Sequence, residues 1–581
     1  MIKKLLLLGV VASALFAATT SEQLRTITLD VKADAYYSYY DSHNNYKYIN
    51  SELIDSWQAK GMHDVLKRSA ELNITNAGGQ KSILLKGQAS NMTKLLYRGV
   101  ELIDPTGPNN APWFDIIGLS GIDRVEIIKG AASSYYGTSA IAGVVNIVPE
   151  QSVKHSFTMM KGANYNEYSF TTGIDTRLWD LGLKYSYLND YQLSSKADNT
   201  EKDRNIIEGL ELSTVIDLGD SYVDAFYSDN KGKTDLDSAF NNYAESDQDI
   251  YGVKYGKEDW FGYGLDAMYS VSDVKRNYDN GSYVPFGTIS NFDVKLNKAC
   301  SEKSLVFGFN KRYQDAATNS SAKTNMEDTA FYGSITGEWM LNYDFGARVT
   351  DYKAGKNITT YTVGLWQSIG NLETKVNYAT GYKQPSIYQM LDPSYGNSAL
   401  TPESSKGIDV AFTYRGFNEV LARANVFNSF VKDRIDYVAT GAWTGYYDNV
   451  GSDTKVAGYS VGVDFLTIPF TKKIAADYSN TNSRDGSGQI LRVPKQKATL
   501  DMIFSYFNYD LSIFYTKVAS RKDFGNVVLP SYQTVDVAFT KDFGDFSIFV
   551  KGVNVLGEDY QELDGFNTLK DVWYVGVSGQ L

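Results

Sequence analysis

The chain has 581 residues, of which 68 are acidic and 56 basic, so its formal net charge is −12. A chain this acidic has no general attraction for nucleic acid, and its one cysteine, Cys300, excludes an intrachain disulfide. Aromatic residues make up 14% of the chain, which is too many for a disordered protein.

The first 18 residues have the pattern of a secretory signal peptide. Lys3 and Lys4 precede an apolar stretch, residues 5–16, and the small residues Ala17 and Ala18 follow. The stretch is shorter than the roughly 20 residues that a membrane-spanning helix needs, so we expect cleavage and export. No later run approaches 18 apolar residues, so a membrane-integral protein would have to cross with strands.

Residues 49–150 have the pattern of a small α/β domain, which follows an N-terminal arm over residues 19–48. The partly helical apolar spacing of Ser56–Asn73 predicts one helix, stopped by the glycines at 78 and 79. Short runs of apolar and β-branched residues predict strands at residues 82–87, 94–99, 124–128 and 144–148.

From residue 151 to the end, apolar and polar residues alternate with a period of two. Leu372–Tyr378, Ile408–Tyr414, Leu500–Tyr506 and Trp573–Leu581 are examples. A half-buried strand produces this alternation. Its recurrence over roughly 430 residues without helical interruption favours a lipid-facing barrel, because a soluble sandwich of that length would split into domains.

Several motifs within and beyond residues 95–149 resemble those of one known family. The motifs in that stretch are Arg124-Val125-Glu126, Lys129-Gly130, Tyr136-Gly137 and Gly143-Val144-Val145-Asn146-Ile147. Residues 378–403, with Pro-Ser and Asn-x-x-Leu-x-Pro-Glu, and the tail 552–581 add two more. In combination they resemble the TonB-dependent outer-membrane transporters, most of all the cobalamin-transporting subgroup. Three residues depart from the family pattern: Lys86, Arg98 and Leu581.

The resemblance implies an all-β transmembrane barrel of about 22 antiparallel strands, residues 151–581, with the small α/β domain as a plug in its lumen. The 432 residues from position 150 onward give each strand and its connection about 20 residues, of which a membrane strand needs ~9–11. The remainder would form short periplasmic turns and longer outer loops. The predicted outer loops are residues 229–249, 277–291, 314–328 and 382–402, and the predicted tight turns are near 344–346 and at 542–545.

The implied function is active import of a scarce, bulky nutrient across the outer membrane of a Gram-negative type bacterium. Work would come from the periplasmic partner TonB and its inner-membrane energising complex, and the barrel would contact outer-membrane lipid. The resemblance places TonB pairing near the mature N-terminus, where one segment alternates as an added edge strand should; an alternative is a first plug strand. The segment comprises Thr26, Ile27, Thr28, Leu29, Asp30, Val31, Lys32 and Ala33.

Two plug loops, residues 87–93 and 104–113, are where the resemblance implies substrate binding. Their mixture of polar and apolar side chains suits a bulky metal chelate that needs a few fixed polar contacts. The expected cargo is cobalamin or another corrinoid, with a ferric siderophore as the alternative. Loss of the signal peptide would leave a charge of −14, which leans weakly against strongly anionic siderophores. The candidate contacts are Gln88, Asn91, Met92, Asn110 and Trp113.

No cofactor is required by this interpretation, but two acidic stretches could hold Ca²⁺ through several carboxylates. The candidate ligands are Asp235, Asp237, Asp247 and Asp249. A solvated acidic loop is the simpler interpretation. Heme is disfavoured, because the three histidines, His43, His63 and His155, all lie outside Tyr382–Pro402, where heme-importing relatives usually carry one.

Catalysis finds little support. Gly458–Gly462 matches the Gly-x-Ser-x-Gly pattern, but its alternation continues to Phe465, whereas a nucleophile elbow needs a strand that turns sharply into a helix. We therefore predict a transporter and no enzyme. A passive porin or adhesin is the alternative from another functional class, and the plug motifs argue against it.

Overall fold

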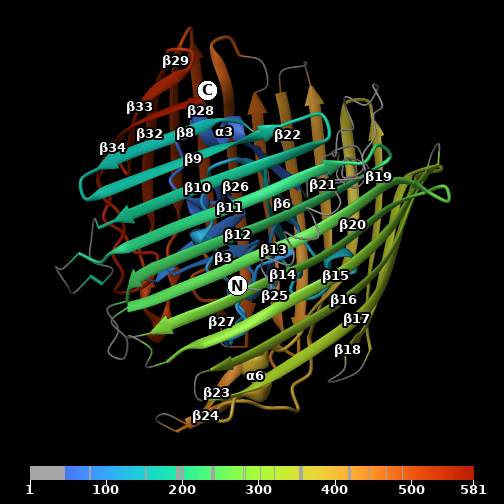
Figure 1. Cartoon of the computed structure of the whole chain (residues 1–581). Coiled ribbons are helices and arrows are strands. Elements are labelled where there is room, and N and C mark those ends of the chain that lie inside the picture. Colours follow the sequence, from blue (N-terminus) through green and yellow to red (C-terminus); the bar gives the residue numbers. More distant parts are fainter. Residues whose placement is uncertain are drawn as a thin grey trace.

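The computed structural model describes residues 46–77, 80–150, 154–191, 196–197, 202–236, 243–278, 281, 283–300, 303–318, 321–352, 357–416, 420–441, 444–465, 468–486 and 488–580. Tilted strands form a wide barrel around a smaller domain (Figure 1). Within these residues, no helix has the length and apolar character to span a membrane. The candidate TonB segment, Thr26–Ala33, lies outside the described residues.

Twenty-two antiparallel strands close the barrel, and the two-residue β27 (Gly488–Gln489) pairs with the last two residues of β26. The last strand pairs with the first, with Gln580 opposite Ser156. This confirms the predicted barrel. Its strands are β8 (Ser156–Gly162), β9 (Tyr165–Asp175), β10 (Trp179–Asp190), β11 (Asn205–Asp217), β12 (Ser221–Asp235), β13 (Tyr243–Trp260), β14 (Tyr263–Tyr278), β15 (Pro285–Cys300), β16 (Lys303–Thr318), β17 (Ser321–Glu338), β18 (Asn342–Tyr352), β19 (Ile358–Ile369), β20 (Leu372–Lys383), β21 (Glu403–Gly416), β22 (Val420–Lys432), β25 (Thr454–Phe465), β26 (Thr471–Asp485), β28 (Gln496–Tyr506), β29 (Tyr509–Val518), β32 (Tyr532–Asp542), β33 (Phe546–Val553) and β34 (Val572–Gln580).

Alternation along each strand separates a lumen face from a lipid face. In β22, Phe427 is buried against the plug while its neighbour Val426 is 53% exposed. Phe307 and Phe331 likewise point outward as exposed aromatic side chains. An outward apolar band with aromatic residues is what a lipid bilayer requires of a barrel surface.

The two ends of the barrel differ in the length of their connections. One end has short turns, such as residues 261–262 and 507–508, and the other has long loops, such as residues 384–402 and 554–571. In outer-membrane barrels the short turns are periplasmic and the long loops extracellular, so the long-loop end is the outer end. The helix α6 (Ile387–Leu391) and the hairpin β23 (Ile435–Gly441)–β24 (Thr444–Asn449) lie there (Figure 1).

Several predicted loop bounds are wrong, because strand pairing continues into polar sequence. Residues 229–235 and 243–249 belong to β12 and β13, and most of 314–328 belongs to β16 and β17. The turn expected near 344–346 lies at residues 339–341, while the turn at 542–545 is confirmed. Backbone groups that pair with a neighbouring strand need no water, so side-chain polarity does not end a strand.

The plug contains a five-stranded mixed sheet in the order β1-β6-β7-β4-β5. Within the described strands of this sheet, β4 and β7 form the single parallel pair. Three of the four predicted plug strands, β4, β6 and β7, lie in this sheet, and the fourth, β3, pairs with β2 in a separate two-stranded sheet. The plug elements are β1 (Tyr46–Asn50), α3 (Ser51–Ser56), α4 (Met62–Leu66), β2 (Leu72–Ala77), β3 (Gln80–Leu85), β4 (Thr93–Tyr97), β5 (Val100–Glu101), β6 (Ile122–Lys129), α5 (Ser133–Tyr136) and β7 (Gly143–Pro149).

The single helix predicted over Ser56–Asn73 is wrong: the segment contains the last residue of α3, the short helix α4 and the start of β2, with turns between them. Gln58 has φ +48° and Gly61 has extended backbone, so the helix is interrupted between them. Its apolar residues are nevertheless in the core, where Val65 and Leu66 are fully buried. Gly143, a glycine of the plug motif, has no room for a side chain. A Cβ at this position would lie 2.0 Å from the carbonyl oxygen of Ile128.

Candidate transport site

Three of the predicted substrate contacts are buried by the protein itself. Gln88 donates from Nε2 to Ser429 Oγ at 2.7 Å in the barrel wall. Met92 belongs to the plug core, and Trp113 packs with Ile116 and Ile207 in a small apolar cluster. Gln88 and Trp113 thus contact the barrel wall, Met92 packs inside the plug, and a ligand would reach the three side chains only after the plug moved.

Asn91 and Asn110 remain partly exposed at the outer side of the plug. Asn91 donates from Nδ2 to Asn109 Oδ1 at 3.5 Å, so the structure brings the two predicted loops together. Asn110 has φ +51°, a left-handed conformation that Asn tolerates better than most residues. The amide-rich junction of these loops faces the outer loops of the barrel.

An outer cap, residues 384–402 together with the hairpin of β23 and β24, covers this region. Asn397 donates from Nδ2 to the Tyr447 carbonyl at 3.0 Å, and the Tyr447 N–H donates to the Tyr395 carbonyl at 3.0 Å. Ser386 Oγ donates to the Pro108 carbonyl of the plug at 3.0 Å. The cap is therefore one hydrogen-bonded unit that also contacts a predicted substrate loop.

Four tyrosines of the cap form a continuous aromatic cluster. Tyr447 lies 6.1 Å from Tyr388 and 5.6 Å from Tyr437 between ring centroids, and Tyr395 lies 5.9 Å from Tyr437. Tyr437 is 40% exposed. Sequence reasoning missed this cluster, although the many tyrosines in residues 382–402 and 437–447 were its signal. Such rings offer apolar faces with polar tips to a large conjugated ligand.

Cationic side chains near the outer end are already paired with carboxylates. Arg276 lies 2.8 Å from Asp104, Lys383 lies 2.8 Å from Glu403, and Lys81 pairs with Asp115. Burial lowers the pKa of His63, against the opposing effect of Asp115. The positive potential that would attract a strongly anionic chelate is thus neutralised at these positions.

Two cavities in the described part of the lumen differ in size and position. The smaller, about 240 Å³, lies towards the outer loops and is lined by Lys60, Asp190 and Glu562, among others. The larger, about 1060 Å³, lies between the plug and strands β9–β18 and reaches the short turn at Thr176–Leu178. The lumen is therefore hollow on its periplasmic side and filled by the plug above it.

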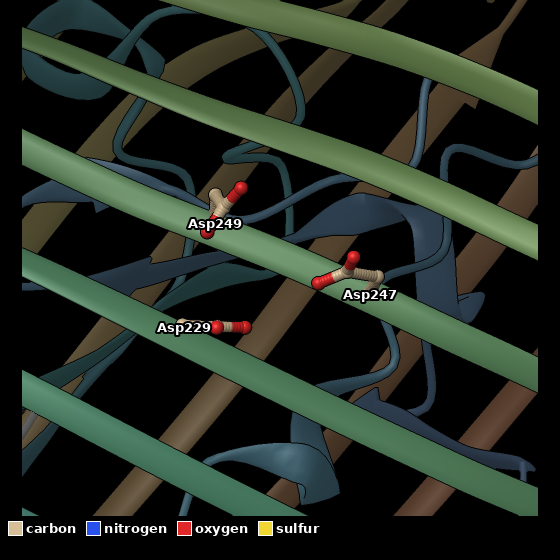
Figure 2. Close-up of side chains that lie close together, drawn as sticks. All are labelled: Asp229, Asp247 and Asp249. Carbon is tan, nitrogen blue, oxygen red and sulfur yellow. The ribbon is translucent and has the colours of Figure 1, made fainter. Parts of the chain in front are cut away.

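Three aspartates lie close together on the outward face of β12 and β13 (Figure 2). Asp229, Asp247 and Asp249 each place a carboxylate oxygen within 4.8 Å of the others. Asp229 is the cross-strand partner of both Asp249 and the lipid-facing Leu210. The sequence did not identify Asp229 as a ligand, because it is the register of β12 on β13 that brings Asp229 next to the other two aspartates.

Of the other two predicted Ca²⁺ ligands, the structure describes Asp235, which lies outside this cluster. Asp235 accepts a hydrogen bond from the Arg204 N–H at 2.9 Å, and Asp237 lies outside the described residues. Lys231 Nζ lies 2.8 Å from Asp229 and neutralises part of the cluster's charge. Three carboxylates are fewer than the six to eight oxygen ligands that Ca²⁺ takes, so water or another molecule would have to complete the shell.

The Gly-x-Ser-x-Gly match lies in the regular barrel strand β25, Thr454–Phe465. Ser460 Oγ donates to Glu71 Oε1 of the plug at 3.1 Å. The local geometry is a ladder-paired strand and lacks the strand-to-helix turn that a nucleophile elbow needs.

Comparisons with known proteins match both parts of the chain. The family model "TonB dependent receptor-like, beta-barrel" matches residues 131–555, and "TonB-dependent Receptor Plug Domain" matches residues 40–144. A vitamin B12 transporter of Vibrio cholerae serotype O1 is 23% identical over 573 residues, covering 92% of each chain.

Among solved structures, a mutant ferric enterobactin receptor of Pseudomonas aeruginosa has a TM-score of 0.80 at 12% identity and covers 94% of this chain and 99% of that one. The siderophore receptor PirA of Acinetobacter baumannii has a TM-score of 0.80 at 14% identity, over 96% of this chain and 100% of that one. The chain belongs to the TonB-dependent receptors, the plugged β-barrels of the bacterial outer membrane.

Proposed function

We propose that this protein imports cobalamin or a closely related corrinoid across the outer membrane, with energy from TonB. The observation that carries the proposal is its similarity to vitamin B12 transporters over 92% of both chains. The solved siderophore receptors are only 12–14% identical, so their likeness supports the fold and leaves the cargo open.

The chemistry of the outer end supports a large ligand without strong negative charge. The cap supplies four clustered tyrosines, and the plug loops beneath supply the amides of Asn91 and Asn110. Nearby cations such as Arg276 and Lys383 are already neutralised by carboxylates. Aromatic faces and amides suit a conjugated, amide-bearing corrinoid better than a polyanionic chelate.

TonB is expected to pair with the segment Thr26–Ala33 as an added edge strand. Family membership supports a periplasmic partner of this kind, since an outer membrane has no energy supply of its own. A passive porin is the weaker candidate, because the plug is tied to the wall on more than one side, for example by Lys551 to Asp64 at 2.8 Å and by Arg98 to Glu211 at 2.9 Å.

The cargo is tested by calorimetric titration of the purified full-length protein with cyanocobalamin and with a panel of ferric siderophores. The proposal expects saturable binding of cyanocobalamin and at least tenfold weaker binding of each siderophore. Saturable binding of one siderophore, with no heat from cyanocobalamin, would replace the corrinoid assignment by the alternative.

A further inference from the structure

The space between the plug and the barrel wall differs between two sides of the plug. On the side of β21–β33 the contacts are dense: Lys497 Nζ donates to three plug carbonyls, those of Lys67, Ser69 and Leu72, at 2.8, 3.0 and 2.6 Å. Ser479 Oγ adds a hydrogen bond to the Ala70 carbonyl at 2.6 Å. A cavity on that side measures only about 50 Å³. The side of β9–β18 instead borders the cavity of about 1060 Å³.

The β4–β5 hairpin of the plug forms a wall of the large cavity, which is lined by Lys94, Leu96, Arg98, Gly99 and Glu101. Among the described residues, the two-residue β5 is an edge strand of the plug sheet and pairs with β4 alone. Its turn, at Arg98 and Gly99, has φ +51° and +79°. Displacing this hairpin would break the ladder between β4 and β7, but it would leave the β1–β6 and β6–β7 ladders of the sheet intact.

Ion pairs tie this hairpin to the barrel wall. Arg98 lies 2.9 Å from Glu211 of β11 and 3.8 Å from Asp224 of β12. Arg312 of β16 donates from Nε and Nη2 to Glu101 at 2.9 and 3.3 Å. A cation–π contact also contributes, since the Arg98 guanidinium lies 5.0 Å from the ring centroid of Phe226.

Arg312 also connects the hairpin to the start of the outer cap. Its Nη1 lies 3.5 Å from Gln384 Oε1, and Gln384 Nε2 donates to Asp328 at 3.2 Å. Gln384 is the first residue of the cap that carries the tyrosine cluster. A shift of the cap on ligand binding would therefore act directly on the groups that hold Glu101.

We infer that the β4–β5 hairpin is the gate of the import path, that the path runs through the large cavity along β9–β18, and that Glu101 and Arg312 form its latch. The inference rests on the proposed import function and specifies where that function opens the lumen. A charged latch suits a water-filled passage, because water solvates both charges once they separate, whereas an apolar seal would expose apolar surface on opening. The cavity exceeds the usual size range of small-molecule pockets, ~300–1,000 Å³, so it has room for a bulky cargo.

Single-channel recording in planar bilayers tests the gate without any substrate. We expect the wild-type chain to pass little current and Glu101→Gln and Arg98→Gln to raise the open-channel current at least tenfold. The matched control is Asp409→Asn, which breaks the ion pair with Lys86 on the other side of the plug. The two ion pairs are similarly buried: the side chains of Lys86 and Asp409 are 5% and 10% exposed, and those of Arg312 and Glu101 are 5% and 3% exposed. If Asp409→Asn conducts as well as Glu101→Gln, or if no gate variant conducts, the gate is elsewhere.

A blocking experiment tests the path. In a Glu101→Gln, Cys300→Ser background, Asn291→Cys places a thiol on the lining of the large cavity, and its neighbour Ser290→Cys places one on the opposite face of the same strand. A bulky maleimide should at least halve the current of the first variant and leave the second unchanged. Current that persists in a fully labelled Asn291→Cys variant would overturn the path. Heat-modifiable electrophoretic migration verifies that each barrel is folded, and because no cargo is used, failure here is separate from failure of cyanocobalamin binding.

Discussion

Arg312 of β16 holds the plug carboxylate of Glu101 through two hydrogen bonds, from Nε at 2.9 Å and from Nη2 at 3.3 Å. Lys94 lies 3.3 Å from the same carboxylate. Burial raises the pKa of Glu101, but Arg312 and Lys94 outweigh it and hold the pKa at about 2. A plug residue is thus kept ionised by a partner 211 positions away in the chain.

This pair predicts a pH dependence of stability. The folded-state pKa of Glu101 is below the ordinary value of 4.5, so ionised Glu101 stabilises the docked plug above about pH 4.5. That stabilisation is lost as the pH falls from 4.5 towards 2, and amounts to at most about 3 kcal/mol. We expect the purified wild type to lose thermal stability between pH 5 and pH 3.

The Glu101→Gln variant provides the control for this pH dependence. It should unfold at a lower temperature than the wild type at pH 6, because the buried positive charge of Arg312 then lacks the negative charge of Glu101. On acidification it should lose less stability than the wild type. Equal losses in the two proteins would assign the pH dependence to other carboxylates.

The architecture could be predicted from the sequence, because a lipid face and a polar lumen impose a period of two on every strand. The plug strands β6 and β7 were likewise visible as runs of β-branched residues. The helix over Ser56–Asn73 failed, since an apolar spacing also fits two short helices and a strand that pack on the same core.

Most of the candidate site depends on contacts that local sequence does not encode. The sequence suggests that Trp113 is an exposed aromatic residue in a loop, but in the fold Ile207 of the barrel wall packs against it. Asp229 joins Asp249 only through the register of β12 on β13. The tyrosine cluster likewise needs the cap loop and the β23–β24 hairpin to fold together, and these contacts are long-range.

The tyrosine cluster predicts measurable losses of ligand affinity. Replacing Tyr437 or Tyr388 by Ala removes aromatic contact area worth about 0.5–1.5 kcal/mol beyond simple burial, so each change should weaken cyanocobalamin binding roughly two- to tenfold in calorimetry. Tyr437→Phe should retain most of the affinity. The control is Tyr269→Ala, a lipid-facing residue that is 48% exposed. Unchanged affinity in both cap variants would remove the cluster from the site.

The TonB segment predicts a separation of binding from transport. Deletion of residues 26–33 should abolish uptake of labelled cyanocobalamin by cells, because no edge strand remains for TonB to pull. Binding at the cell surface should persist, since the outer cap and plug loops are unchanged. If surface binding also disappeared, the segment would be part of the folded plug, as in the alternative interpretation.

The aspartate cluster predicts weak, specific Ca²⁺ binding at the outer surface of the barrel. Asp229, Asp247 and Asp249 bring three carboxylates together, and their mutual repulsion is relieved when a divalent cation binds. Calorimetry should detect Ca²⁺ binding that Asp247→Asn weakens at least tenfold. Asp235→Asn is the matched control, because Asp235 lies outside the cluster and accepts a hydrogen bond from the Arg204 backbone. No heat on adding Ca²⁺ to the wild type would eliminate the site, and equal weakening by both variants would indicate a diffuse effect of surface charge.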